Sequence, residues 1–170
     1  MRAMRRRLIA LSLPGVFLAA CSSAPSLRRP PQSSAPPEPV AAKDTAPRHD
    51  IVLHAMAMLD RNYTFGGKRL HTGFDCSGLV SFVYRESAGL RLSGSSAEMA
   101  RQTRSIDPAQ AMPGDLVFFN TLGASFSHVG IYVGDARFVH AENERTGVKT
   151  SSMKSRYWAQ RFEGFRTLFG

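Results

Sequence analysis

The stretch Asp75-Cys76-Ser77-Gly78 precedes a largely apolar run, residues 79–84, that has the character of a buried helix. Asp75 suits the position before a helix, because an aspartate side chain accepts hydrogen bonds from the unpaired N–H groups of the first turn. Cys76 then stands at the helix N-terminus, where those N–H groups favour a thiolate over a thiol. The sequence therefore predicts a reactive cysteine with a pKa in the range of about 3.5–7.5 found for activated thiols.

Two histidines lie downstream of Cys76, one on each strand of a predicted hairpin. His128 opens the segment 128–133, and His140 lies in the segment 138–141, beyond a turn around 134–136. Side chains alternate faces along a strand, so the length of the turn decides whether the two imidazoles meet. A two-residue turn places them on opposite faces. A three-residue loop at 134–136, or a bulge with the same effect, pairs Gly130 with His140 and brings both histidines to one face, and we expect one of these two.

The remaining patterns predict helices first and an antiparallel sheet afterwards. Asp50 is expected to cap a first helix whose apolar residues recur at i, i+4 and i+7. The helix that begins at Cys76 should end near Ser87, because Gly89 suits the position after a helix. The other expected elements are a helix at 96–102 and strands at 116–119, 128–133, 138–141 and 165–169. This order indicates an α+β fold.

The first 20 residues have the features of an export signal. Four arginines between residues 2 and 7 precede an apolar run, residues 8–20, that is too short and too interrupted to span a membrane. The run ends in Leu18-Ala19-Ala20-Cys21, which resembles the bacterial lipoprotein signal. That resemblance implies that Cys21 is the lipidated first residue of the mature chain, and that Ser22 directs it to the outer membrane, facing the periplasm. Secretion without a lipid is the alternative.

Residues 21–48 are expected to form a disordered linker. Seven of the ten prolines lie between residues 22 and 48, together with serines, alanines and few large apolar side chains. Such a composition cannot bury a core, so the linker would act as a tether that contributes nothing to folding. Residues 49–170 are then expected to form one domain of ordinary size.

The chain has only two cysteines, and they have different expected roles. If Cys21 is acylated, Cys76 has no disulfide partner and persists as a free thiol in an oxidising compartment. The alternative is a buried, inert cysteine. That alternative does not explain the aspartate before Cys76 or the two histidine segments after it.

The net charge is +9, and removal of the four signal arginines leaves +5. An exported chain does not meet nucleic acid, so we exclude that partner. The positive charge is scattered along the domain, which fits either a surface that faces anionic cell wall or lipid, or a solvated polar face.

Five motifs together resemble the NlpC family of bacterial cell-wall cysteine endopeptidases. They are 63–67 (YTFGG), 75–78 (DCSG), 113–119 (PGDLVFF), 128–134 (HVGIYVG) and 138–140 (FVH). The resemblance implies a compact papain-like fold in which Cys76 is the nucleophile, His128 the base and His140 the residue that orients it. It also implies stem peptides of peptidoglycan as substrates, cut next to D-glutamate or at cross-links that involve diaminopimelate. The possible involvement of a regulatory partner protein stays open.

The chemistry of these residue types agrees with the implied roles. Cys76 would attack a carbonyl carbon and form an acyl-enzyme that water later resolves. His128 would take the thiol proton and return it to the leaving amine, while His140 would hold one ring nitrogen of His128 and fix its tautomer.

Three further residues are candidates for oxyanion or substrate binding, each with an alternative. Tyr63 would assist the backbone N–H of Cys76 in holding the oxyanion, or it is a packed aromatic residue. Asp75 would recognise a substrate amine, or it only caps the helix, and as an anion it should raise the pKa of the neighbouring thiol. The role of Ser77 has the same two alternatives, substrate recognition or a purely structural role.

Two other classes of protein compete with the hydrolase. Thiolate and imidazole ligands suit zinc, so Cys76, His128 and His140 could form a metal site, although the chain has no close-spaced ligand pair such as His-Glu-x-x-His. A papain-like domain that binds cell wall without catalysis is the second competitor, and amidase or transpeptidase activity on the same scaffold stays open. The hydrolase needs no metal or other cofactor.

Overall fold

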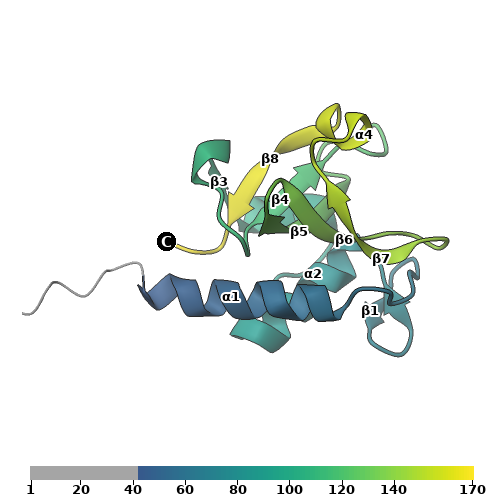
Figure 1. The fold of residues 1–170 in the computed structure, drawn as a ribbon. Coiled ribbons are helices and arrows are strands. Elements are labelled where there is room, and N and C mark those ends of the chain that lie inside the picture. The colour runs from purple at the N-terminus through teal and green to yellow at the C-terminus, as the bar shows by residue number, and fades with distance from the viewer. Residues whose placement is uncertain (1–41) are drawn as a thin grey trace, which may run out of the picture. The chain divides into compact units, whose positions relative to one another are not determined.

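The structure is a computed structural model that describes residues 42–170. Figure 1 shows its arrangement. The helices are α1 (Ala42–Ala57), α2 (Cys76–Ala88), α3 (Ser96–Gln102), the 3-10 helix η1 (Pro108–Gln110) and α4 (Arg156–Ala159). The strands are β1 (Lys68–Arg69), β2 (Gly73–Phe74), β3 (Arg104–Ile106), β4 (Leu116–Phe119), β5 (His128–Gly134), β6 (Arg137–Asn143), β7 (Gly147–Ser152) and β8 (Phe162–Thr167).

Within residues 42–170, six strands form one antiparallel sheet in the order β3-β8-β4-β5-β6-β7. Helices α1 and α2 lie on one side of this sheet, and α4 lies at its other side (Figure 1). The larger core fills the space between the sheet and α1 and α2, with Ile51, Leu79 and Ile131 fully buried. A second core on the opposite face packs Trp158 of α4 against Phe119 and Phe138. The predicted α+β fold, with helices packed on an antiparallel sheet, is confirmed.

Helix α2 begins and ends as its sequence predicts. The side chain of Asp75 accepts a hydrogen bond of 2.6 Å from the backbone N–H of Gly78, which makes Asp75 the N-cap. Gly89 adopts the left-handed conformation with φ of 65°, and its N–H donates to the carbonyls of Arg85 and Tyr84. The capped ends place Cys76 at the first position of a well-defined helix.

The β5–β6 hairpin has the register that the two histidines require. Ile131 pairs with Val139, a register that sets Gly130 opposite His140. The turn has two residues, Asp135 and Ala136, both with positive φ, and a bulge between Tyr132 and Gly134 supplies the extra residue. The predicted bulge is thus confirmed in place of the three-residue loop, and His128 and His140 share one face.

Helix α1 begins earlier than predicted. It starts at Ala42 instead of near Asp50, and Arg48 is a buried residue with 7% of its surface exposed. The Arg48 guanidinium forms an ion pair of 2.6 Å with Asp115 at the start of the central sheet and a hydrogen bond of 3.2 Å with Thr167. The predicted linker boundary at residue 48 is therefore wrong. The composition of residues 21–48 predicted a disordered linker. Arg48 instead pairs with a buried carboxylate 67 residues further along the chain.

The predictions for the N-terminal segment lie outside the described residues. They are the signal at 1–20, lipidation of Cys21 and the linker as far as residue 41. In the part of the chain that the structure describes, no helix combines the length and the apolar character needed to cross a membrane.

Candidate active site

Cys76 lies at the first turn of α2, with its thiol against the start of β5. The backbone N–H groups of Val129, Ser77 and Cys76 itself point towards the sulfur and lower the pKa of the thiol. Burial of the sulfur has the larger effect and, with the nearby Asp75 carboxylate, raises the pKa of Cys76 to about 11. The predicted thiolate at neutral pH is therefore wrong for the free domain. A helix N-terminus is a local feature, whereas the loss of water around the sulfur depends on the packed fold.

This pKa leads to a testable pH dependence of alkylation. In a chain that carries Cys21→Ala, so that Cys76 is the sole thiol, iodoacetamide should react with Cys76 at a rate that rises about tenfold per pH unit between about pH 6 and 9. Only the thiolate reacts, and its population grows in that proportion below the pKa. Intact-mass measurements over time give the rate. A rate that is constant between about pH 5 and 8 would indicate a standing thiolate and contradict the neutral thiol.

His128, His140 and Ser151 form a chain of hydrogen bonds across three neighbouring strands. Nε2 of His128, on β5, lies 2.9 Å from Nδ1 of His140, on β6. Nε2 of His140 lies 2.8 Å from Oγ of Ser151, on β7. The structure thus brings together the two histidines that the sequence singled out and adds a serine that it did not.

The roles of the ring nitrogens follow from the chemistry that His128 would perform. To accept the thiol proton at Nδ1, His128 must carry its own proton on Nε2 and donate it to Nδ1 of His140. His140 must then carry its proton on Nε2 and donate it to the Ser151 hydroxyl. If the two hydrogen bonds ran in the opposite direction, Nδ1 of His128 would carry the proton and His128 could not act as a base.

Aromatic side chains enclose this pair of histidines. The ring of Trp158 lies 5.3 Å from that of His128 and 4.8 Å from that of His140, and the ring of Phe138 lies 4.6 Å from that of His140. Burial lowers the pKa of His128 to about 4, against the opposing effect of the Glu142 and Asp75 carboxylates. Burial also lowers the pKa of His140 well below its ordinary value. At neutral pH both imidazoles are uncharged, which is the form that can accept a proton.

The Asp75 carboxylate joins the start of α2 to the loop before β1. One oxygen, Oδ1, accepts from the N–H of Gly78 and from the Ser77 hydroxyl, at 2.6 and 2.9 Å. The other, Oδ2, accepts from the N–H of Gly66 at 3.0 Å. The capping role predicted for Asp75 is confirmed, and Ser77, which is buried, supports it. Recognition of a substrate amine by these two residues stays a prediction.

The loop and the helix approach so closely that glycine is required. A Cβ atom on Gly78 would lie 1.9 Å from the carbonyl oxygen of Gly67, and one on Gly67 would lie 2.5 Å from the carbonyl oxygen of Gly73. These contacts give a physical reason for the glycines in the segments 63–67 and 75–78. They bring the loop against the helix turn that bears Cys76.

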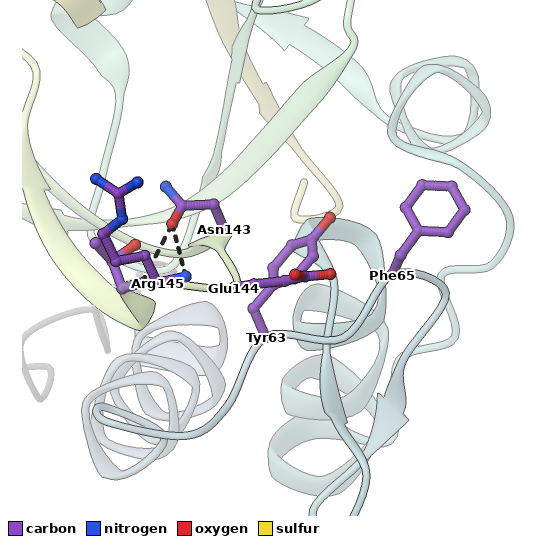
Figure 2. A pocket seen from close by; sticks show the side chains of 6 residues that line it. Tyr63, Phe65, Asn143, Glu144 and Arg145 are labelled. Atoms are coloured by element: carbon purple, nitrogen blue, oxygen red, sulfur yellow. Dashed lines mark hydrogen bonds between the residues drawn. The ribbon is translucent and has the colours of Figure 1, made fainter.

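Tyr63 lines a cleft of about 1040 Å³ beside this turn. In Figure 2, Phe65 lies on one side of Tyr63, Asn143 and Arg145 lie on the other, and the Glu144 carboxylate is drawn over the Tyr63 ring. Burial is the main cause of the raised pKa of Tyr63, and the charges of Cys76, Asp75 and Glu144 add to it. The phenol therefore stays protonated at neutral pH and can donate a hydrogen bond into the cleft.

A second cavity, of about 470 Å³, lies next to His128. It is lined by Thr121, Leu122, His128, Glu142, Asn143, Tyr157 and Trp158. Asn143 lines both cavities. The two spaces therefore adjoin at Asn143, and of the two it is the second that His128 lines.

Two residues of the site were missed by the sequence analysis. Ser151 lies on β7, a strand that the sequence did not predict because the segment 147–152 lacks alternation of apolar and polar side chains. Glu142 lies two residues after His140 on the same strand, so the alternation rule that placed His140 could also have placed Glu142 beside it.

The metal alternative has no support in the geometry. Among residues 42–170, no three or more His, Cys, Asp or Glu side chains are grouped so that they could hold a metal ion. The other described histidines lie elsewhere; His54, for example, contacts the Ser87 hydroxyl at 3.0 Å.

A cysteine at a helix start beside a strand-borne histidine pair, on an α+β scaffold, defines the papain-like class of domains. The chain belongs to the NlpC/P60 family, whose profile matches residues 60–167. The predicted family and the predicted papain-like fold are thus confirmed.

Three similar proteins illustrate the relationship. Murein DD-endopeptidase MepH of Escherichia coli (strain K12) is 34% identical over 114 residues, which are 65% of this chain and 42% of that protein. A protein named probable endopeptidase p60, of Listeria grayi, is 41% identical over 115 residues, 68% of this chain and 22% of that protein. A crystal structure described as similar to lipoprotein, NLP/P60 family, from Staphylococcus aureus subsp. aureus Mu50 has a TM-score of 0.66 at 33% identity, covering 75% of this chain and 43% of that chain.

The match is confined to one part of each relative. This chain spans less than half the length of the two curated relatives, MepH and the Listeria grayi p60 protein. The comparison therefore establishes the family of the domain.

Proposed function

We propose that this protein is a cysteine endopeptidase that hydrolyses amide bonds in the stem peptides of peptidoglycan. The observation that carries the proposal is the hydrogen-bonded array His128–His140–Ser151 beside the half-buried Cys76, whose sulfur lies against the N–H of Val129. The name of MepH, a murein DD-endopeptidase, supports the substrate class.

In the proposed reaction, Sγ of Cys76 forms a bond to the substrate carbonyl carbon while Nδ1 of His128 takes the thiol proton. Both groups start uncharged, so charge develops only during attack. The imidazolium that forms is stabilised through His140, which accepts from Nε2 of His128. His128 then gives its proton to the departing amine, the C–N bond breaks, and a thioester remains. Water, deprotonated by His128, hydrolyses the thioester and restores the thiol.

Two groups would hold the oxyanion of the tetrahedral intermediate. They are the backbone N–H of Cys76 and the hydroxyl of Tyr63, which stays protonated at neutral pH. Donors of this kind contribute roughly 3–4 kcal/mol to transition-state stability in acyl transfer. Asp75, with Ser77 beside it, would add a negative charge that attracts a substrate ammonium group on the acyl side of the cleft.

Digestion of purified peptidoglycan, followed by mass analysis of the fragments, tests the proposed function. Release of fragments cut between D-glutamate and diaminopimelate, or at the cross-link, would identify the bond. Binding of the protein to peptidoglycan without any fragment would support the non-catalytic alternative. Cleavage at the amide that joins peptide to glycan would indicate an amidase, and new cross-links would indicate a transpeptidase.

Ser151→Ala provides a test of the histidine chain. Without the hydroxyl acceptor, His140 no longer favours the tautomer that accepts from His128, so we expect kcat to fall about tenfold while KM is unchanged. Ser152→Ala is the matched control, because Ser152 is the next residue of β7 and is exposed on the opposite face. Ser151→Thr, which keeps a hydroxyl, should recover part of the activity. Equal kcat in Ser151→Ala and Ser152→Ala would contradict the role of the hydroxyl.

We also propose that the mature protein begins at Cys21, carries acyl chains there and is anchored in the outer membrane, facing the periplasm. The support is the charged and apolar signal followed by Leu18-Ala19-Ala20-Cys21. Mass spectrometry of the native N-terminus tests this, and an unmodified chain would refute it.

A further inference from the structure

The hydrogen-bonded histidine chain of the candidate site contains no charged side chain. His128, His140 and Ser151 are all uncharged at neutral pH, so the positive charge that His128 acquires in the proposed reaction has no ionic partner within the chain. The rings of Trp158 and Phe138 enclose the pair, and a charge that forms among apolar groups is costly unless an opposite charge lies near it. A carboxylate outside the chain would therefore stabilise the transition state.

An irregularity of β6 directs Glu142 to this place. Its neighbours on both sides pair with consecutive residues of β7, Val148 and Gly147, so Glu142 itself has no partner residue and forms a bulge. A bulge interrupts the alternation of faces and redirects the side chain that it carries. Here the redirected side chain lines the cavity of about 470 Å³ together with His128. The bulge thus brings a carboxylate to the side of the sheet on which the histidines lie.

The Glu142 carboxylate is only partly neutralised by its neighbours. Its Oε2 accepts a hydrogen bond of 2.7 Å from the Thr146 hydroxyl, and Nζ of Lys149 lies 3.5 Å away, farther than in an ordinary charge-assisted hydrogen bond. The Glu142 side chain is 23% exposed and that of Lys149 is 41% exposed. Water therefore screens the carboxylate less than the ammonium group, and a net negative charge remains at the edge of the cavity.

The two charged side chains on β6 and β7 act on the histidines with opposite signs. Burial lowers the pKa of His128, and the Glu142 carboxylate opposes this effect more strongly than the Asp75 carboxylate does. Burial also lowers the pKa of His140, and the charges of His128 and Lys149 lower it further. Lys149 is the residue of β7 that pairs with His140 in the register of the sheet.

Three other elements face His128. From α2 come the Asp75 carboxylate, which already accepts three hydrogen bonds, and the Cys76 thiol. From α4 comes the phenol of Tyr157, and β4 contributes an aromatic ring. Among these groups only Asp75 carries a charge at neutral pH, and its effect on the pKa of His128 is smaller than that of Glu142. Glu142 is therefore the stronger source of negative charge at His128.

We propose that Glu142 is the counter-charge of the histidine chain: it stabilises the His128 imidazolium during attack on the substrate, and Lys149 opposes it. The inference rests on the proposed peptidase function. Glu142 neither takes nor gives a proton. The thiol proton passes from Sγ of Cys76 to Nδ1 of His128, and the carboxylate acts through space on the charge that results. Because it acts through His128, Glu142 is a positioning residue and not a catalytic one.

Two charge-removing variants should change the rate in opposite directions. With a soluble peptidoglycan fragment that the wild-type protein cleaves, Glu142→Gln should lower kcat/KM at pH 7 about fivefold, because His128 becomes a weaker base. Lys149→Gln should raise it about twofold, because an opposing charge is lost. Glu142→Asp, which keeps the charge, should recover part of the rate. Glu86→Gln makes the same change at an exposed carboxylate on α2 and should leave kcat/KM unchanged.

The pH profile of kcat/KM distinguishes the charge from a structural role. Its acid limb reports the free protein, in which the pKa of His128 is about 4. Glu142→Gln should move this limb to lower pH by about 0.5–1 unit, because the imidazolium loses its counter-charge. Lys149→Gln should move it to higher pH. Loss of a merely structural contact would lower the rate in both variants and leave the limb in place.

The outcomes separate this inference from the proposed function. Shifts of opposite sign in Glu142→Gln and Lys149→Gln, with none in Glu86→Gln, support the counter-charge. A lower rate in Glu142→Gln without movement of the acid limb, or shifts of the same sign in both variants, overturns it, while the peptidase function stands. If the wild-type protein cleaves no peptidoglycan fragment, the proposed function fails and the counter-charge fails with it.

Discussion

Replacement of Cys76 by alanine should abolish cleavage of peptidoglycan, with kcat reduced by about 10⁶-fold, the scale found when the nucleophile of a hydrolase is removed. In the proposed reaction the sulfur of Cys76 forms the bond to the substrate carbonyl carbon, so its removal leaves no acyl-enzyme step. Because alanine fits where cysteine was and the Asp75 cap is retained, the melting temperature should change by only a few degrees. Fragment release from peptidoglycan, measured by mass spectrometry, gives the activity, and thermal unfolding gives the stability.

The two histidines should show graded effects in the same assay. His128→Ala should be nearly as damaging as Cys76→Ala, because nucleophile and base act as a unit. His140→Asn, which keeps a hydrogen-bond acceptor for Nε2 of His128, should reduce kcat by only about 10²-fold. Retention of full activity in Cys76→Ala, or an effect of His140→Asn as large as that of His128→Ala, would be incompatible with the proposed roles.

The second large effect is on stability and comes from Arg48. Arg48→Met removes the partner of Asp115, which is only 1% exposed and would retain a hydrogen bond of 2.8 Å from the N–H of Met112. An uncompensated buried charge of this kind costs about 3–5 kcal/mol. For a domain of this size we expect the melting temperature to fall by roughly 10–20 °C. Thermal unfolding followed by circular dichroism is the measurement.

Two further variants make this result specific. Arg85→Met removes a similar arginine from an exposed ion pair with Glu86, whose side-chain exposures are 51% and 45%, so the loss should be below about 1 kcal/mol. The double variant Arg48→Met/Asp115→Asn removes both buried charges and should recover part of the loss. If Arg48→Met is no more harmful than Arg85→Met, the segment before residue 49 does not belong to the folded domain and the original linker boundary is restored.

The elements that the sequence predicted well are those in which local rules and tertiary contacts agree. Asp75 and Gly89 mark the ends of α2 by capping rules that act within one or two turns. The face shared by His128 and His140 follows from alternation along two adjacent strands, which needs only the register of one hairpin. These two features, the start of α2 and the shared face of the hairpin, position Cys76, His128 and His140, which make up most of the candidate site.

The remaining features depend on contacts that no local pattern contains. The pKa of Cys76 follows from how much water the folded domain excludes from the sulfur, and this effect exceeds that of the helix N-terminus. Arg48 is buried because its guanidinium donates a hydrogen bond to a carboxylate far along the chain. Ser151 occupies a short strand whose polar sequence resembles a loop, and only its place beside β6 gives it a partner in His140.

The three hydrogen bonds of the Asp75 carboxylate have a mechanical consequence. Because one carboxylate holds both the first turn of α2 and the loop at Gly66, the candidate nucleophile and one side of the cleft are joined by hydrogen bonds. The contact between Gly78 and the Gly67 carbonyl leaves no slack between them. Movement of this wall away from the helix would break the hydrogen bond from the Gly66 N–H to Oδ2, whereas the cap of the helix uses Oδ1. In the proposed function, a bound substrate would therefore meet a wall that is hydrogen-bonded to the residue directly before Cys76.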